Sequence, residues 1–471
     1  MRGSCRYRHY RDGPRNCRGT PALVLAAWKG HLEEVKLLLE YGADVHDAPK
    51  NGLQLNSLQA ASGNGNVQIM SILIEAGADI NSPAVGRRGK TALQYAVIKN
   101  KTAATLFLLE LGADVNARVA EKGGMTALQA AVLCQNEDMV ETLLVLGADI
   151  NGQASDGGYS ALSTAILSNS IPLFWRLIEA SASVAYADWE DGDAFNMPLL
   201  VASRKGSLEF IQLLLDLGID INALSRSGRT LGELALLEAA VHHQEKAMLF
   251  LLKHSDFIDR SILTKALEYV DLIIPDTQCG VLVQALVDRG ADINAGWVGE
   301  DHSILQKACR KGVMELVRYL VQNGADINFP PPARDGLTAL QAAVFIGDLE
   351  MVDFLLQHGA DVNGAASHYG GVTAVQVAAV LGYVRIAQML IAAGADIAAP
   401  ASCRGTRALD SAARNGRFDM VKLLLDNYQL KGGESFSDVC KGPIRIARKE
   451  CHWAIVALLE NYQRDPDLGG R

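Results

Sequence analysis

The sequence has little of what marks a membrane-spanning, secreted or β-rich protein. No run approaches 18 consecutive apolar residues, and the first 20 residues lack the apolar core of a signal peptide. Aromatic residues make up only 6% of the 471 residues, with 13 prolines, so the aromatic enrichment of β-proteins is missing. We therefore expect a soluble, predominantly helical chain located in the cytoplasm, the nucleus or both.

Motifs of metal sites and of common enzymes are also missing. The eight cysteines form no CxxC pair, and the ten histidines, including adjacent His242 and His243, form no HExxH motif. A GxSxG nucleophile elbow is absent as well. The sequence thus predicts free thiols, no metal or other cofactor, and no enzymatic activity.

One string resembles a phosphate-binding loop but lacks the surroundings that such a loop needs. Residues 84–91 read Ala-Val-Gly-Arg-Arg-Gly-Lys-Thr, with alanine in place of the first glycine. A phosphate loop follows a buried strand and opens a helix, whereas the segment before this string has a helix-ending pattern. We do not expect nucleotide binding at Lys90 and Thr91.

The chain is acidic outside its N-terminus. The chain carries a net charge of −9, yet residues 1–19 contain six arginines and one aspartate, which leaves −14 for the remainder. Gly3, Gly13 and Pro14 break helices, so we expect residues 1–19 to form a flexible basic arm. Direct sequence-specific DNA binding is not expected from an acidic chain with such an arm.

What the sequence has in abundance is repetition. Gly-Ala-Asp-Val-His at 42–46 is the first of a series of related pentapeptides. The later ones begin at Gly77, Gly112, Gly147, Gly218, Gly290, Gly324, Gly359 and Gly394. Most steps are 34 or 35 residues, and two gaps of 71 and 72 conceal degenerate units that end near Ser181 and Ser255. With two more units after residue 394, the sequence contains about thirteen repeats.

Each unit reads as two antiparallel helices. Thr126-Ala-Leu-Gln-Ala-Ala opens a first helix with small residues, and its threonine can cap a backbone N–H. The second helix places Val140, Leu143 and Leu144 on one apolar face and ends at Gly147, which suits a left-handed C-terminal cap. Stacking of such pairs buries faces that one pair cannot bury alone.

These motifs resemble the ankyrin repeat family. The family's Thr-Pro-Leu-His-x-Ala corresponds here to Thr-Ala-Leu-Gln-x-Ala, a variant similar to fungal members, and its helix-ending Gly-Ala-Asp-x-Asn recurs throughout. The resemblance covers residues 20–463, with glutamine for histidine and a period near 35 rather than 33. It implies an all-α solenoid of stacked helix pairs with extended hairpin fingers. We expect degenerate units at about 182–290 and a C-terminal tail at 464–471.

Aromatic residues in polar loops are the first candidate binding site. Trp189 and Phe195 lie among four acidic residues in one finger, and Trp297 lies near Glu300 and Asp301 in another. Tryptophan in such a loop can anchor a protein interface. The alternative is that these rings fold back and cover the irregular middle repeats.

Basic residues near the ends of successive first helices are the second candidate. The series comprises Lys29, Lys99, Arg204 with Lys205, Arg310 with Lys311, and Arg414, and Arg87 with Arg88 extend it into a finger. Such a stripe on an acidic protein favours an acidic partner, although solvated surface bases are the ordinary alternative.

Function follows from the resemblance more than from any single motif. In the ankyrin repeat family, partners contact the fingers and the first helices on the concave side. We therefore expect a non-enzymatic scaffold that binds one or more unidentified, acidic protein partners, with no membrane insertion. The alternatives are a transcriptional co-regulator of a fungal secondary-metabolite gene cluster and a fragment of a larger signalling protein.

Overall fold

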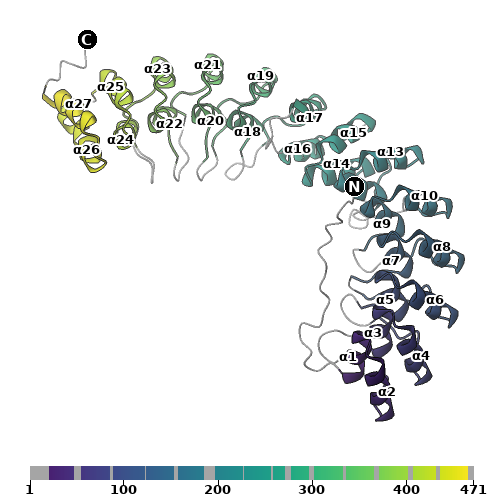
Figure 1. Cartoon of the computed structure of the whole chain (residues 1–471). Helices are drawn as coiled ribbons and strands as arrows, with labels where there is room; N and C mark the ends of the chain where they lie inside the picture. The colour runs from purple at the N-terminus through teal and green to yellow at the C-terminus, as the bar shows by residue number, and fades with distance from the viewer. Residues whose placement is uncertain are drawn as a thin grey trace. The chain divides into compact units, whose positions relative to one another are not determined.

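The computed structural model of the chain consists of paired helices that stack in chain order within each of two compact units (Figure 1). It describes residues 21–46, 55–84, 89–121, 123–152, 158–184, 197–225, 228–255, 258–270, 277–295, 302–331, 336–364, 371–400, 407–430 and 435–464. The chain divides into two compact units, Met1–Asp256 and Phe257–Arg471. The arm predicted at 1–19 and the tail beyond Arg464 lie outside the described residues.

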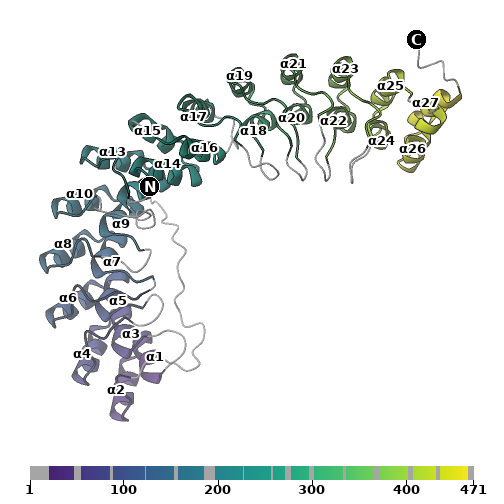
Figure 2. The ribbon, with the colours of Figure 1, turned by 180° about the vertical axis from the view of Figure 1, so that it is seen from behind.

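The described part of the N-terminal unit contains seven helix pairs. Its first helices, here named inner helices, are α1 (Ala22–Lys29), α3 (Ser57–Asn64), α5 (Ala92–Ile98), α7 (Ala127–Leu133), α9 (Ala161–Ser168), α12 (Pro198–Lys205) and α14 (Leu231–Val241). Its second helices, the outer helices, are α2 (Leu32–Glu40), α4 (Val67–Glu75), α6 (Thr102–Glu110), α8 (Glu137–Val145), α10 (Ile171–Glu179), α13 (Leu208–Asp216) and α15 (Glu245–His254). Inner and outer helices form two separate rows, which Figure 2 shows from behind.

The described part of the C-terminal unit contains six pairs in the same arrangement. Its inner helices are α16 (Arg260–Glu268), α18 (Ile304–Lys311), α20 (Ala339–Ile346), α22 (Ala374–Leu381), α24 (Ala408–Arg414) and α26 (Phe436–Lys449). Its outer helices are α17 (Thr277–Asp288), α19 (Met314–Gln322), α21 (Leu349–Gln357), α23 (Val384–Ala392), α25 (Phe418–Asp426) and α27 (Trp453–Arg464). The 26 described helices confirm the predicted all-α solenoid. None of them is long and apolar enough to cross a bilayer.

The repeated threonine starts the inner helices, as predicted. At the start of α20, Thr338 Oγ1 accepts a hydrogen bond from the backbone N–H of Gln341, and Gln341 Oε1 accepts one from the N–H of Thr338. This reciprocal capping box satisfies two donors that a helix start leaves unpaired. The same box occurs at Asn56–Gln59, Thr91–Gln94, Thr126–Gln129, Thr230–Glu233, Ser303–Gln306 and Thr373–Gln376.

The repeated glycine ends the outer helices. After α21, Gly359 has φ +88°, and the next residue, Ala360, donates from its N–H to the carbonyl oxygen of Leu355 at 3.0 Å. A side chain at this left-handed position would be strained, which explains the glycine in the repeat. At the end of the first degenerate unit Ser181 adopts the same conformation with φ +67°. The unit predicted to end near Ser181 is therefore present.

The core lies between the rows and between neighbouring pairs. In the pair of α20 and α21, Ala343 on the inner helix and Met351, Val352 and Leu355 on the outer helix are completely buried. Small residues let adjacent inner helices approach closely, while the larger outer-helix side chains fill the space behind them. Stability is therefore built from one pair to the next.

Asparagine side chains connect the turns of neighbouring pairs. Asn328 donates from Nδ2 to the carbonyl oxygen of Gly359 at 3.0 Å, and its Oδ1 accepts from the N–H of Asp361 at 2.8 Å. Asn81, Asn116, Asn294 and Asn363 make the same two bonds to the following turn. The repeat aspartates accept a hydrogen bond from the backbone N–H two residues later, which stabilises the turn.

The degenerate units at about 182–290 stay a prediction from the sequence. The boundary between the two compact units, at Asp256 and Phe257, falls inside this stretch. The turn after α17, in the first pair of the C-terminal unit, differs from the other turns. Its Asp292 donates from the backbone N–H to the hydroxyl of Thr264 in α16, whereas the corresponding aspartate in other turns donates to an asparagine. The described residues contain one isolated bridge, between Leu224 and Thr230, and no regular sheet.

Candidate functional site

Five of the nine predicted partner-binding residues lie outside the described residues. They are the three loop aromatics and the two finger arginines, Trp189, Phe195, Trp297, Arg87 and Arg88. Their proposed contacts with a partner stay predictions. The remaining four, Arg204, Lys205, Arg310 and Lys311, are described, and they fall into two classes.

Arg204 and Lys205 are engaged within the N-terminal unit. Arg204 is 13% exposed, and its Nε lies 2.8 Å from Oε2 of Glu238 in the next inner helix, while Nη1 bonds the hydroxyl of Tyr159. The ammonium group of Lys205 donates to the carbonyl oxygens of Ile166 and Leu167 at the end of α9. A cation placed there satisfies open carbonyls and complements the helix dipole. Both side chains thus join neighbouring pairs.

Arg310 and Lys311 are exposed at the end of α18 in the C-terminal unit. Neither makes an ion pair with a side chain in the part of the chain that the structure describes. Arg414 at the end of α24 is exposed as well. These three bases, unlike Arg204 and Lys205, present their charge to solvent.

Two exposed apolar residues at the same helical position were not predicted. Phe345 in α20 is 52% exposed and Val380 in α22 is 36% exposed. Each lies seven residues after the N-cap of its helix, as do Arg310 and Arg414. The 35-residue spacing from Arg310 was a sequence signal that could have identified them.

Charged side chains of the outer row pair with each other between neighbouring pairs. Arg318 of α19 lies 2.6 Å from Glu350 of α21, and Arg176 of α10 forms an ion pair with Glu141 of α8. Tyr319 of α19 donates to Asp288 of α17 at 2.7 Å, and burial together with this bond raises the pKa of Tyr319 to about 12. Part of the charge in the outer row therefore connects the array internally.

Residues 89–91, the described end of the string that resembles a phosphate-binding loop, belong to an ordinary repeat. Thr91 caps α5, and the Lys90 ammonium lies 5.3 Å from the centre of the Tyr95 ring, a cation–π contact. The preceding regular element is the outer helix α4 and not a buried strand. This arrangement agrees with the sequence-based interpretation of Lys90 and Thr91.

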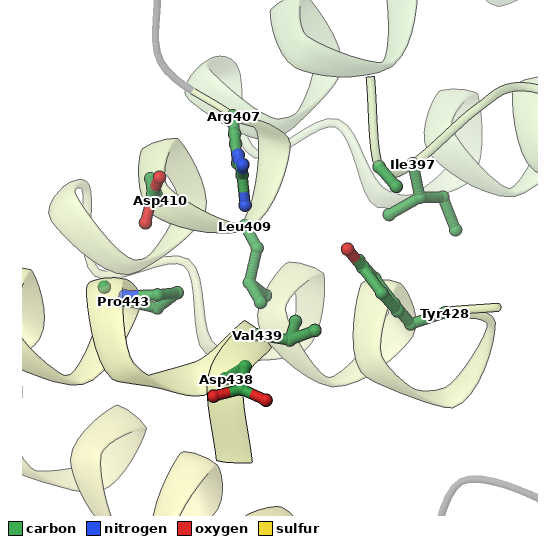
Figure 3. Close-up of a pocket in the computed structure, with 10 residues that line it drawn as sticks. Ile397, Arg407, Leu409, Asp410, Tyr428, Asp438, Val439 and Pro443 are labelled. Carbon is green, nitrogen blue, oxygen red and sulfur yellow. The ribbon is translucent and has the colours of Figure 1, made fainter. Parts of the chain in front are cut away.

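One small pocket lies near the C-terminal end of the array, between the starts of α24 and α26. It has a volume of about 90 Å³, and Figure 3 shows Arg407, Asp410, Tyr428 and Asp438 around it. Burial raises the pKa of Asp410, against the opposing charges of Arg407, Arg414 and Arg445. The buried Oδ1 of Asp410 has no hydrogen-bond partner.

Histidine, cysteine and carboxylate side chains do not gather into a metal site in the described residues. The described thiols Cys134, Cys309, Cys440 and Cys451 are all unpaired. Burial raises the pKa of Cys440 to about 11 and that of Cys309 further still, so both thiols stay protonated and unreactive at neutral pH.

Comparison with known proteins identifies the repeats. Family models described as ankyrin repeats in several copies match residues 23–119, 59–154, 277–366 and 375–425, and a single-repeat model matches 196–226. The chain is 26% identical over 171 residues to an ankyrin repeat and KH domain-containing protein of Caenorhabditis briggsae. It is 28% identical over 159 residues to mask-1, a protein of the same description from Caenorhabditis elegans. These matches cover 36% and 34% of the chain but only 6% of each relative.

Among solved structures, the human ASB11 ankyrin repeat domain is similar to this chain, with 28% identity and a TM-score of 0.39. The match covers 49% of this chain and 97% of that domain. The family models match both compact units, in agreement with the capping boxes and glycine turns of the structure. On these family-model matches, the chain belongs to the ankyrin repeat family, whose repeats are generally protein–protein interaction modules.

Proposed function

We propose that the chain is a non-enzymatic scaffold that binds protein partners on its inner helices and the adjoining loops, in the cytoplasm or the nucleus. The observation that carries this proposal is the charge on four inner helices of the C-terminal unit. Helices α18, α20, α22 and α24 contain four basic residues, Lys307, Arg310, Lys311 and Arg414, and one acid, Asp410. A partner's carboxylates can approach Arg310 and Lys311, which make no side-chain ion pair among the described residues.

The free thiols support an intracellular location. Four cysteines are unpaired among the described residues, as expected for a protein that works in a reducing compartment. The roles of transcriptional co-regulator and of a piece of a larger signalling protein stay predictions. Mapping of the transcript upstream of Met1 would distinguish between them.

The test is capture of partners on the immobilised full chain, identification by mass spectrometry, and titration calorimetry of each partner. We expect the double variant Arg310→Glu/Lys311→Glu to weaken binding about tenfold or more, since it places carboxylates opposite an acidic partner. The control is Lys422→Glu, which reverses an exposed charge on the outer helix α25. Retention of no specific protein would contradict the proposed function, and binding that survives the double variant would show that these bases are not the binding surface.

A further inference from the structure

One register position forms a pattern across four consecutive inner helices of the C-terminal unit. The seventh residue after the N-cap is Arg310 in α18, Phe345 in α20, Val380 in α22 and Arg414 in α24. These helices pack side by side in that order (Figure 1). Because they start with the same geometry, the four side chains occupy the same position on successive helices. We name this set the inner ladder.

The inner ladder exposes apolar surface in its middle. Phe345 is 52% exposed and Val380 36%, and both are flanked along the row by exposed bases. Leu349, which starts α21 after the turn that follows α20, is 37% exposed as well. A single exposed apolar residue is ordinary on a protein surface. Adjacent exposed residues at one repeat position indicate a surface that gains from being covered.

The same register position in the N-terminal unit is less exposed. Trp28, Ile98, Leu133 and Leu167 are partly buried there, and Arg204 is paired with Glu238. The exposed apolar pair between two bases is therefore a property of the C-terminal unit and not of the repeat in general.

The spacing of the four side chains in the inner ladder sets the length of a protein segment that can contact all of them. Packed helices lie roughly 8–10 Å apart, so three steps from Arg310 to Arg414 span about 24–30 Å. A segment in the extended polyproline II conformation advances about 3.1 Å per residue with three residues per turn, so about eight to ten residues cover this span and residues three apart face the same side. Each step between helices then corresponds to about three residues of such a segment.

We propose that the inner ladder binds an extended protein segment with an acidic residue at each end and two apolar residues between them. The carboxylates pair with Arg310 and Arg414, and the apolar residues cover Phe345 and Val380. This proposal rests on the proposed scaffold function and adds the chemistry of the partner. A nucleic acid would use the two bases but gains little from the apolar pair.

The test begins with a random dodecapeptide display library selected on the immobilised full chain. We expect enriched peptides to carry two acidic residues about eight to ten positions apart, with apolar residues about three apart between them. The affinity of a synthetic enriched peptide is then measured by fluorescence anisotropy. Phe345→Ala and Arg310→Glu should each lower it about tenfold, and Arg310→Glu should also reduce its dependence on salt.

Matched controls separate the inner ladder from general surface effects. Leu37 on the outer helix α2 is 52% exposed, like Phe345, and Leu37→Ala should leave the affinity unchanged. Lys99→Glu reverses an exposed charge beside the corresponding position of α5 and should also have no effect. Unchanged thermal melting of all variants shows that each one is folded.

Three outcomes would overturn the proposal: no enriched peptide, enriched peptides without the acidic and apolar pattern, or equal binding to Phe345→Ala and the parent chain. Binding of an oligothymidylate that is lost with Arg310→Glu but kept with Phe345→Ala would assign the bases to nucleic acid instead. If a captured protein partner binds the Phe345→Ala and Arg310→Glu variants normally, the inner ladder is not its binding site, while the scaffold function stands. If the chain retains no protein at all, the scaffold function itself fails.

Discussion

The side-chain amide of Gln341 in α20 donates a 3.1 Å hydrogen bond to the carbonyl oxygen of Gly364, in the loop that leads to the next pair. Gln341 is 1% exposed, and its Oε1 also closes the capping box with Thr338. The same link over 23 residues recurs at Gln59, Gln94, Gln129, Gln306 and Gln376. Glutamine at this position, where the family motif has histidine, therefore ties these six inner helices to the loop that leads to the next pair.

Replacement of Gln341 should destabilise the C-terminal unit. Gln341→Ala removes the bond to Gly364 and the bond to Thr338 N–H, and it leaves buried polar groups without partners. We expect a loss of about 2–3 kcal/mol in the free energy of unfolding, measured by urea denaturation. The control Gln357→Ala removes an exposed side chain that bonds Asp353 and should cost less than about 0.5 kcal/mol. Equal effects of the two variants would refute the linking role.

The two predicted basic sites should respond differently to truncation. Arg204→Ala leaves Glu238, 18% exposed, without its main partner, so we expect a loss of about 2 kcal/mol in stability. Arg310→Ala removes an exposed base and should change stability by less than about 0.5 kcal/mol. Thermal and urea unfolding of the two variants provides the comparison, and similar losses would show that Arg204 is not a structural residue.

Asp410 should make the last pairs sensitive to pH. Asp410 occupies the position of the repeat glutamine. Its Oδ1 packs so closely against Gly442 of α26 that a Cβ added to Gly442 would lie only 3.2 Å from this oxygen. Since burial raises the pKa of Asp410 in the folded chain, the folded state holds its proton more tightly than the unfolded state does. The contribution of this group to stability is therefore greatest below the unfolded pKa and is lost as pH rises through the folded pKa.

The variant Asp410→Asn removes this titration and should raise the urea midpoint at neutral pH. The increase should shrink as pH falls to about 4, the ordinary pKa of aspartate. The control Asp353→Asn changes an exposed carboxylate on α21 and should show no such trend. An Asp410→Asn effect that is independent of pH would contradict the buried-carboxylate explanation.

The degenerate stretch should open more readily than the regular pairs. It contains the boundary between the compact units and has Ser255 in place of the repeat glycine, and coupling between neighbours holds a repeat array together. Amide hydrogen exchange of the free chain should be faster within 182–290 than within 77–147 or 324–394. Uniform protection across these segments would show that the prediction is wrong.

Much of the fold could be predicted from the sequence because the repeat encodes it locally. The threonine and glutamine of the capping box and the glycine after each outer helix act within a few residues. The apolar face of Val140, Leu143 and Leu144 likewise follows from helical spacing. Ser181 could be placed because it stands one period after Gly147, although serine itself gives no signal for a left-handed turn.

The candidate site could be predicted less well because exposure depends on neighbouring pairs. Arg204 and Arg310 occupy the same register position, yet Arg204 faces Glu238 and Tyr159 from other pairs, and Arg310 has no such neighbours among the described residues. Phe345 and Val380 resemble core residues in sequence. Their exposure emerges only when the four inner helices are stacked.

Hydroxyl-radical footprinting of the full chain, with and without a captured protein partner, tests most directly whether partners bind the inner helices of the C-terminal unit. Phe345 on the inner row and Leu37 on an outer helix are equally exposed, at 52%, so each reports on its own row. We predict that the partner lowers the modification rate of Phe345 severalfold and leaves that of Leu37 unchanged. An unchanged rate at Phe345 together with protection of outer-helix residues would contradict the account.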